Sequence, residues 1–170
     1  RDPLWSRGLG DVYKRQMLET IDFAPKIGLN TYMLEFDVPM AYYNLWYSHR
    51  HNPFKEPEPL SPNTVRQWKR VCETEIAKRG LLFHDMGHGW TGEAFGIDTK
   101  GGWNAETRTY PEDVMQYVAM VDGKRSLFGG VPLNTNFCMS NPDARGKVVQ
   151  YVADYAESHQ NVDFLHIWLA

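Results

Sequence analysis

The chain has 170 residues, a formal net charge of −3 and two cysteines, Cys72 and Cys138. This length suits one ordinary domain or part of a larger one. A mildly acidic chain without a Lys/Arg cluster argues against nucleic acid as the main partner. No apolar run is long enough to span a bilayer. Two cysteines outside any CxxC spacing exclude a disulfide framework.

Residues 6–16, SRGLGDVYKRQ, resemble the in-frame translation of a transposon adapter used in sequencing libraries. Read-through of this kind contaminates metagenomic gene predictions, so residues 1–16 are set aside as an artefactual tail. We expect residues 17–170 to form an incomplete domain that is truncated at both ends. Because a signal peptide would have been lost with the natural start, the compartment, cytoplasmic or secreted, stays open.

The first half of the chain alternates helices with short strands. Apolar spacing predicts a helix over residues 18–27, and alternation predicts a strand over residues 29–36. A second helix is predicted over residues 61–79, because Ser61 is a good cap residue and is followed by proline. An apolar strand over residues 81–83 follows it directly.

The connection over residues 38–60 is long and rich in aromatic residues, among them Trp46. Loops of this length are usually functional or disordered, and an aromatic composition is not typical of disorder. These rings could plug the mouth of a barrel, or they could offer flat apolar faces to sugar rings. Both interpretations stay open.

The second half continues the alternation. It contains a glycine- and tryptophan-rich loop, a helix over residues 112–121, an extended piece over residues 131–138, a helix from Asn141 to His159 and a strand over residues 162–169. Strands that alternate with amphipathic helices indicate a parallel α/β sheet. Because neither GxGxxG nor GxxxxGK[ST] occurs, the pattern favours part of a (β/α) barrel over a nucleotide-binding fold.

The stretch Leu81–Gly96, LLFHDMGHGWTGEAFG, concentrates chemical side chains at the end of an apolar strand. His84, Asp85, His88 and Trp90 fall within seven positions, and glycines let the backbone bend among them. A rigid strand that leads into a polar loop is how barrel enzymes present groups to a substrate. Each histidine alone would be unremarkable, but the group indicates a site.

Three segments together resemble one family: KIGLNTYMLEF, EIAKRGLLFHDMGHGWTGEAFGI, and LNTNFCMSNPDAR with VDFLHIWLA. It is a bacterial family of unknown function whose members are glycoside hydrolase-like TIM-barrel proteins, related to α-glucuronidases and β-N-acetylhexosaminidases. The resemblance covers residues 21–170. It implies a partial (β/α)8 barrel holding the second, third and fourth strands, and a carbohydrate partner. We expect no cofactor and no metal.

In the hexosaminidase relatives the third strand ends in an acidic residue, Met, Pro, Gly and His. Asp85, Met86, Gly87 and His88 match this pattern with the proline missing. The histidine of the relatives orients the catalytic acid, so the resemblance gives Asp85 and His88 supporting catalytic roles. The fourth strand of the relatives ends in a His, two glycines and an Asp-Glu pair, which VDFLHIWLA lacks. We therefore expect the general acid to lie beyond Ala170, and this chain alone to be inactive.

Glycoside cleavage needs two carboxyl functions, or one carboxyl and a substrate group. The carboxyl groups near the predicted strand ends belong to Glu35, Asp37 and Asp85, although each alone is more often a salt-bridge partner. Asn134 and Asn136 could bond sugar hydroxyls or cap a loop. The predicted substrate-binding residues are Glu35, Asp37, Trp46, His84, Trp90, Asn134, Asn136, His166 and Trp168.

Trp90 and Trp168 could each stack on a pyranose ring or pack the protein interior. For Trp90, between glycines, we expect substrate contact, and for Trp168, within a strand, packing is favoured. Two alternative functions stay open. One is a metal-dependent hydrolase on the same barrel, with His84 and His88 joined by His49 or His51. The other is a carbohydrate-binding barrel without catalytic acids.

Overall fold

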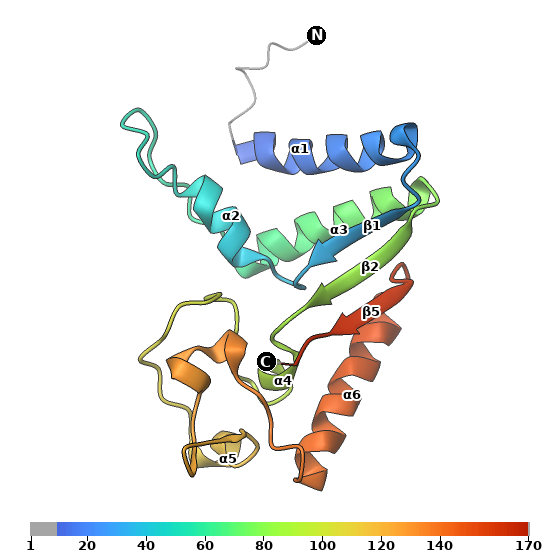
Figure 1. The fold of residues 1–170 in the computed structure, drawn as a ribbon. Helices are drawn as coiled ribbons and strands as arrows, with labels where there is room; N and C mark the ends of the chain where they lie inside the picture. Colours follow the sequence, from blue (N-terminus) through green and yellow to red (C-terminus); the bar gives the residue numbers. More distant parts are fainter. Residues whose placement is uncertain (1–9, 170) are drawn as a thin grey trace. The chain divides into compact units, whose positions relative to one another are not determined.

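The computed structural model describes residues 10–169. Its elements follow in the order α1 (Gly10–Phe23), η1 (Ala24–Ile27), β1 (Thr31–Glu35), α2 (Met40–Tyr47), α3 (Pro62–Lys78), β2 (Leu82–Gly87), α4 (Trp90–Glu93), α5 (Glu112–Met115), β3 (Met120–Val121), β4 (Lys124–Arg125), η2 (Phe128–Gly130), η3 (Pro132–Asn134), α6 (Pro142–Ser158) and β5 (Phe164–Ile167) (Figure 1). No helix within this part of the chain has the length and apolarity that crossing a membrane requires.

Strands β1, β2 and β5 form a three-stranded parallel sheet in that order, which confirms the predicted mixed α/β class (Figure 1). Strand β2 is longer than predicted, because it continues past Phe83 to Gly87. The chain divides into two compact units. The first runs to His84 and includes Asn161–Phe164, and the second comprises Asp85–Gln160 and the chain from Leu165.

The first unit is built around an apolar core between its long helices and its strands. Helices α1 and α3 pack against each other, and the buried core consists of Ile21, Ala24, Leu34, Cys72, Ile76, Leu81 and Phe83. Helix α3 begins where predicted, because the Ser61 side chain accepts a hydrogen bond of 3.1 Å from the backbone N–H of Thr64. Helix α1 begins at Gly10, inside the adapter-like stretch.

Helix α2 lies within residues 38–60, where the sequence analysis placed a connection without regular structure. Its residues Tyr43 and Tyr47 are buried, and both rings contact Trp68 of α3, at centroid distances of 5.2 and 5.3 Å. Helix formation here depends on tertiary packing of the aromatic face, since the segment carries no side-chain cap.

The second unit has a smaller core of Phe95, Ala144 and Val148, with α6 as its long helix. Asn141 caps α6 as predicted, its side chain accepting hydrogen bonds from the backbone N–H groups of Asp143 and Ala144. The predicted helix over residues 112–121 is wrong beyond Met115, because Met120–Val121 pairs instead with Lys124–Arg125 in a short antiparallel hairpin. The predicted extended piece over residues 131–138 begins with the 3-10 turn η3.

Candidate functional site

Successive side chains near the end of β2 point to opposite faces of the sheet, as in any strand. His84 belongs to the first unit, where it is half-buried and its ring lies 4.5 Å from that of Phe164. Asp85 and His88 belong to the second unit. Because the stretch is a strand rather than a helix, the i, i+4 spacing of His84 and His88 does not place both on one helical face.

Asp85 is fully buried, and its carboxylate is held by a helix distant in sequence. The hydroxyl of Tyr155 in α6 donates a hydrogen bond of 2.5 Å to Asp85 Oδ2. The ring of His159 stacks on Tyr155 at a centroid distance of 3.6 Å. A buried carboxylate fixed in this way can position neighbouring backbone, but it does not face solvent.

Trp90, which the sequence analysis expected in a loop, is the first residue of α4 and is only 5% exposed. Its ring meets Tyr155 edge-on at 4.8 Å and Tyr151 at 6.1 Å. Its Nε1 is buried and has no hydrogen-bond partner among residues 10–169. Trp90 therefore forms part of the interior of the second unit, although substrate contact was expected of it.

His88 lies between two exposed tryptophans. The ring of Trp103 lies 5.1 Å from the His88 ring at 75°, and the ring of Trp168 lies 5.2 Å away at 74°. Trp168 is placed here by its backbone N–H, which donates to the carbonyl of Gly87 at 3.1 Å. His88 Nδ1 is buried and has no hydrogen-bond partner within the described part of the chain.

The exposure of these two tryptophans gives the group its chemical character. Trp103 is 56% exposed and Trp168 is 36% exposed, although packing was favoured for Trp168 in the sequence analysis. Flat indole surfaces next to an imidazole nitrogen combine an apolar face with a hydrogen-bonding group. We refer to His88, Trp103 and Trp168 as the His88 cluster.

Glycine is required at the turn that follows His88. Gly89 has a φ of 103°, and a Cβ at this position would lie 2.9 Å from Thr99 Oγ1. Thr99 in turn donates from that oxygen to Glu93, so the contact belongs to a connected network. The turn between β2 and α4 is thus closely packed as well as left-handed.

Of the predicted substrate-binding residues Glu35, Asp37 and Trp46 in the first unit, one is paired in salt bridges and two are exposed. Asp37 pairs with Arg70 at 3.1 Å and with Arg66 at 3.5 Å, which is the salt-bridge arrangement weighed for each acid. Glu35, at the end of β1, is exposed. Trp46 in α2 is 42% exposed, and its ring lies 6.4 Å from that of Tyr42.

Asn134 and Asn136 line one cavity of the second unit, of about 410 Å³. The exposed ring of Phe128 and the side chain of Ser126 line it with them. His166 lies half-buried in β5 of the same unit. The convergence of all nine predicted binding residues on one pocket stays a prediction, since they belong to both units.

The alternative function with a metal ion would need several ligating side chains close together. Among the residues that the structure describes, no three His, Cys, Asp or Glu side chains lie close enough to hold a metal ion. His49, one of the two histidines considered for the metal alternative, contacts Glu58 at 3.0 Å in the first unit.

Sequence reasoning missed two residues, Trp103 of the His88 cluster and Tyr155, which bonds Asp85. Trp103 follows two glycines in a loop that was noted only for its composition, and Tyr155 lies within the helix predicted from Asn141 to His159. A glycine pair before a tryptophan was a usable signal for Trp103. No local signal connects Tyr155 with Asp85.

Comparison of the chain with protein-family models, with curated protein sequences and with solved structures finds no match in any of the three.

Proposed function

We propose that the chain is part of a glycoside hydrolase-like (β/α) barrel, and that the His88 cluster contributes to its carbohydrate-binding site. The observation that carries the proposal is the position of His88 between two exposed indole rings, with Nδ1 buried and unpaired. Sugar rings offer C–H faces to aromatic rings and hydroxyls to polar groups, so this combination of groups suits them.

The sheet topology supports the fold part of the proposal. Strands that are consecutive in a (β/α) barrel are neighbours in the sheet and parallel, and β1, β2 and β5 have that order. The His88 cluster follows the carboxyl end of β2, which is where barrel enzymes carry their sites. A closed barrel is a proposal that goes beyond these three strands.

Asp85 has a positioning role in this proposal, because it is fully buried and hydrogen-bonded to Tyr155. It holds the segment that leads to His88 and does not touch the sugar.

Of the three candidate carboxylates, Glu35 alone is exposed. This observation favours a second candidate function, carbohydrate binding without turnover, because cleavage requires two suitably placed groups.

The test is a binding screen with the 170-residue chain, in which tryptophan fluorescence is followed during titration with mono- and oligosaccharides. We expect saturable binding of at least one sugar, weakened about threefold to tenfold by Trp103→Ala, the range of one aromatic contact. Phe54→Ala is the matched control, because Phe54 is also an exposed aromatic residue, 94% exposed, and lies in the first unit.

His88→Gln tests the polar part of the site, since it retains a hydrogen-bonding side chain but changes its geometry. We expect it to weaken binding of the same sugar, while Phe54→Ala leaves binding unchanged. Absence of binding across the screen, or equal loss in Trp103→Ala and Phe54→Ala, would remove the proposal. Release of sugar from aryl glycosides by the same chain would contradict the expectation that the general acid lies beyond Ala170.

A further inference from the structure

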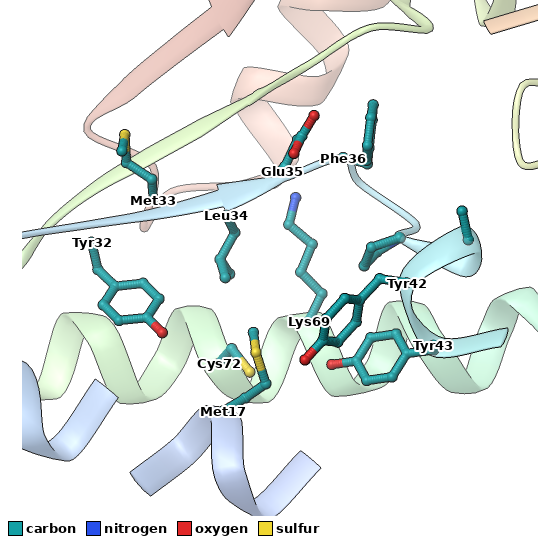
Figure 2. Close-up of a pocket in the computed structure, with 12 residues that line it drawn as sticks. Met17, Tyr32, Met33, Leu34, Glu35, Phe36, Tyr42, Tyr43, Lys69 and Cys72 are labelled. Carbon is teal, nitrogen blue, oxygen red and sulfur yellow. The ribbon is translucent and has the colours of Figure 1, made fainter. Parts of the chain in front are cut away.

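A second cavity lies entirely within the first unit and includes only one of the residues predicted to bind substrate, Glu35. It measures about 290 Å³ and lies between β1, α2 and α3, with Met17 of α1 at its border (Figure 2). Its volume is close to the lower limit for small-molecule sites, about 300 Å³. Most of its lining is aliphatic or aromatic, including Leu34, Phe36 and Pro39.

A tyrosine of α2 turns its polar end into this cavity. Tyr43 is 2% exposed, and its ring is fixed by Tyr42 at 5.2 Å and by Trp68 at 5.2 Å. Figure 2 shows the hydroxyls of Tyr42 and Tyr43 directed away from α2 and into the cavity. A phenol hydroxyl that faces a cavity can donate a hydrogen bond to a ligand bound there.

The charges at the cavity determine which ligands it suits. Lys69 and Glu35 are the charged residues in its lining, one of each sign. Lys69 is 3% exposed, and its Nζ lies 3.7 Å from Glu73 Oε1. Figure 2 shows Glu35 on the opposite side of β1 from Lys69. The charge of Lys69 is already paired with Glu73, and burial in the cavity would cost a charged ligand its hydration.

Tyr32, Tyr43 and Cys72 of the lining keep their protons at pH 7. Burial raises the pKa values of Tyr32 and Tyr43, and neighbouring Cys72 and Tyr42 add to the effect. Burial also raises the pKa of the Cys72 thiol to about 11. Phenol and thiol groups that stay protonated can donate hydrogen bonds to a ligand oxygen.

We propose that this cavity binds a small uncharged molecule with a single ring and one hydroxyl or carbonyl oxygen, which meets the hydroxyl of Tyr43. The ring occupies the apolar space beside Leu34, and the oxygen accepts a hydrogen bond from the Tyr43 phenol. The site is independent of the His88 cluster, because every residue of its lining belongs to the first unit.

The experiment compares benzyl alcohol, toluene and benzoate as probes of the 170-residue chain by ligand-observed NMR titration. We expect benzyl alcohol to bind about threefold to tenfold more tightly than toluene, the range of one net hydrogen bond. Benzoate should bind at least about tenfold more weakly than benzyl alcohol, because its carboxylate must be desolvated. Equal binding of benzyl alcohol and toluene, tighter binding of benzoate, or no binding at all overturns the proposal.

Tyr43→Phe removes one hydroxyl and keeps the ring. It should lower the affinity for benzyl alcohol to that for toluene and leave toluene binding unchanged. Tyr47→Phe is the matched control, because it makes the same change in the same helix at a residue outside the cavity lining. If Tyr43→Phe fails to fold, the affinities of the unaltered chain for the three probes still test the proposal. Sugar binding at the His88 cluster should not respond to Tyr43→Phe, so the two proposals fail separately.

Discussion

The hydroxyl of Tyr155 and the carboxylate of Asp85 are joined by a hydrogen bond of 2.5 Å, although the two residues lie 70 positions apart. Both side chains are buried, at 7% and 0% exposure. The bond therefore connects the last turn of α6 with β2 inside the second unit. A hydrogen bond to a buried charged group contributes more to stability than one between neutral groups.

Tyr155→Phe should destabilise the protein by about 1.5–3 kcal/mol, because it removes a donor from a buried carboxylate. The measurement is urea unfolding followed by circular dichroism. Tyr151→Phe is the comparison, since the Tyr151 hydroxyl donates to Glu93 at 2.8 Å in a half-buried position and should cost less. Equal losses of unfolding free energy in the two variants would show that the burial of Asp85 does not strengthen its hydrogen bond with Tyr155.

Gly89→Ala should destabilise the protein more than Gly96→Ala does. Both glycines have positive φ, 103° and 81°, so alanine is strained at either position by about 1–2 kcal/mol. Only at Gly89 does the new Cβ also approach another side chain, at 2.9 Å from Thr99 Oγ1. The difference between the two unfolding free energies measures this contact. A smaller loss for Gly89→Ala would indicate that Thr99 moves freely.

Ser61→Ala should cost about 1 kcal/mol of unfolding free energy, because the N–H of Thr64 then loses its cap acceptor. Ser61→Asp keeps an acceptor at this position and adds a charge that the helix N-terminus favours. It should therefore retain the stability of the unaltered chain in the same urea titration. Loss of stability in both variants would mean that the hydroxyl acts through a contact other than the cap.

Cys138 should react with iodoacetamide at lower pH than Cys72. Hydrogen bonding by Ser140, followed by that of Arg125, lowers the pKa of the Cys138 thiol to about 7, since both partners favour the thiolate. Burial raises the pKa of Cys72 to about 11. Alkylation followed by mass spectrometry between pH 5.5 and 9 (about the range in which cysteine labelling is practical) should therefore modify Cys138 with a midpoint near 7 and spare Cys72.

The matched variant for this prediction is Ser140→Ala, which removes the larger of the two stabilising interactions. It should shift the midpoint for Cys138 to higher pH and leave Cys72 unmodified. An unchanged midpoint would mean that Arg125 alone sets the acidity of this thiol.

The long helices were predictable because their signals are local. Ser61 and Asn141 mark the first residues of α3 and α6 by side-chain hydrogen bonds within three positions, and the structure contains both. The short helix α2 was not predictable in this way. Its stability comes from Tyr43 and Tyr47 packing on Val65 and Trp68, and a contact with another helix leaves no periodic signal within residues 38–60.

The error over residues 112–121 has a different cause. Apolar spacing favoured a continuous helix, but Asp122 and Gly123 both have positive φ, 50° and 76°, as the two central residues of a type I′ turn require. This Asp-Gly pair fixes the hairpin of β3 and β4, and Val118 pairs with Phe137 in an isolated bridge. A turn signal that was present in the sequence thus outweighed the helical period.

For the candidate sites, the sequence identified individual residues better than their surroundings. His88 could be selected from the glycines around it, and Trp103 and Trp168 reach it from a loop and from a strand end distant in sequence. Whether a side chain is buried was harder to predict. Trp90 faces the interior because α4 begins directly after Gly89, which turns it toward Tyr155.

Helix α1 crosses from the adapter-like residues into the remainder of the chain without a break at Met17. Starting a helix is costly, whereas adding residues to an existing one costs little, and Ile21 at 0% exposure holds the existing part against the core. An upstream sequence of almost any origin could therefore be drawn into regular structure here. Helical conformation before Met17 is accordingly no sign of common ancestry with the residues that follow.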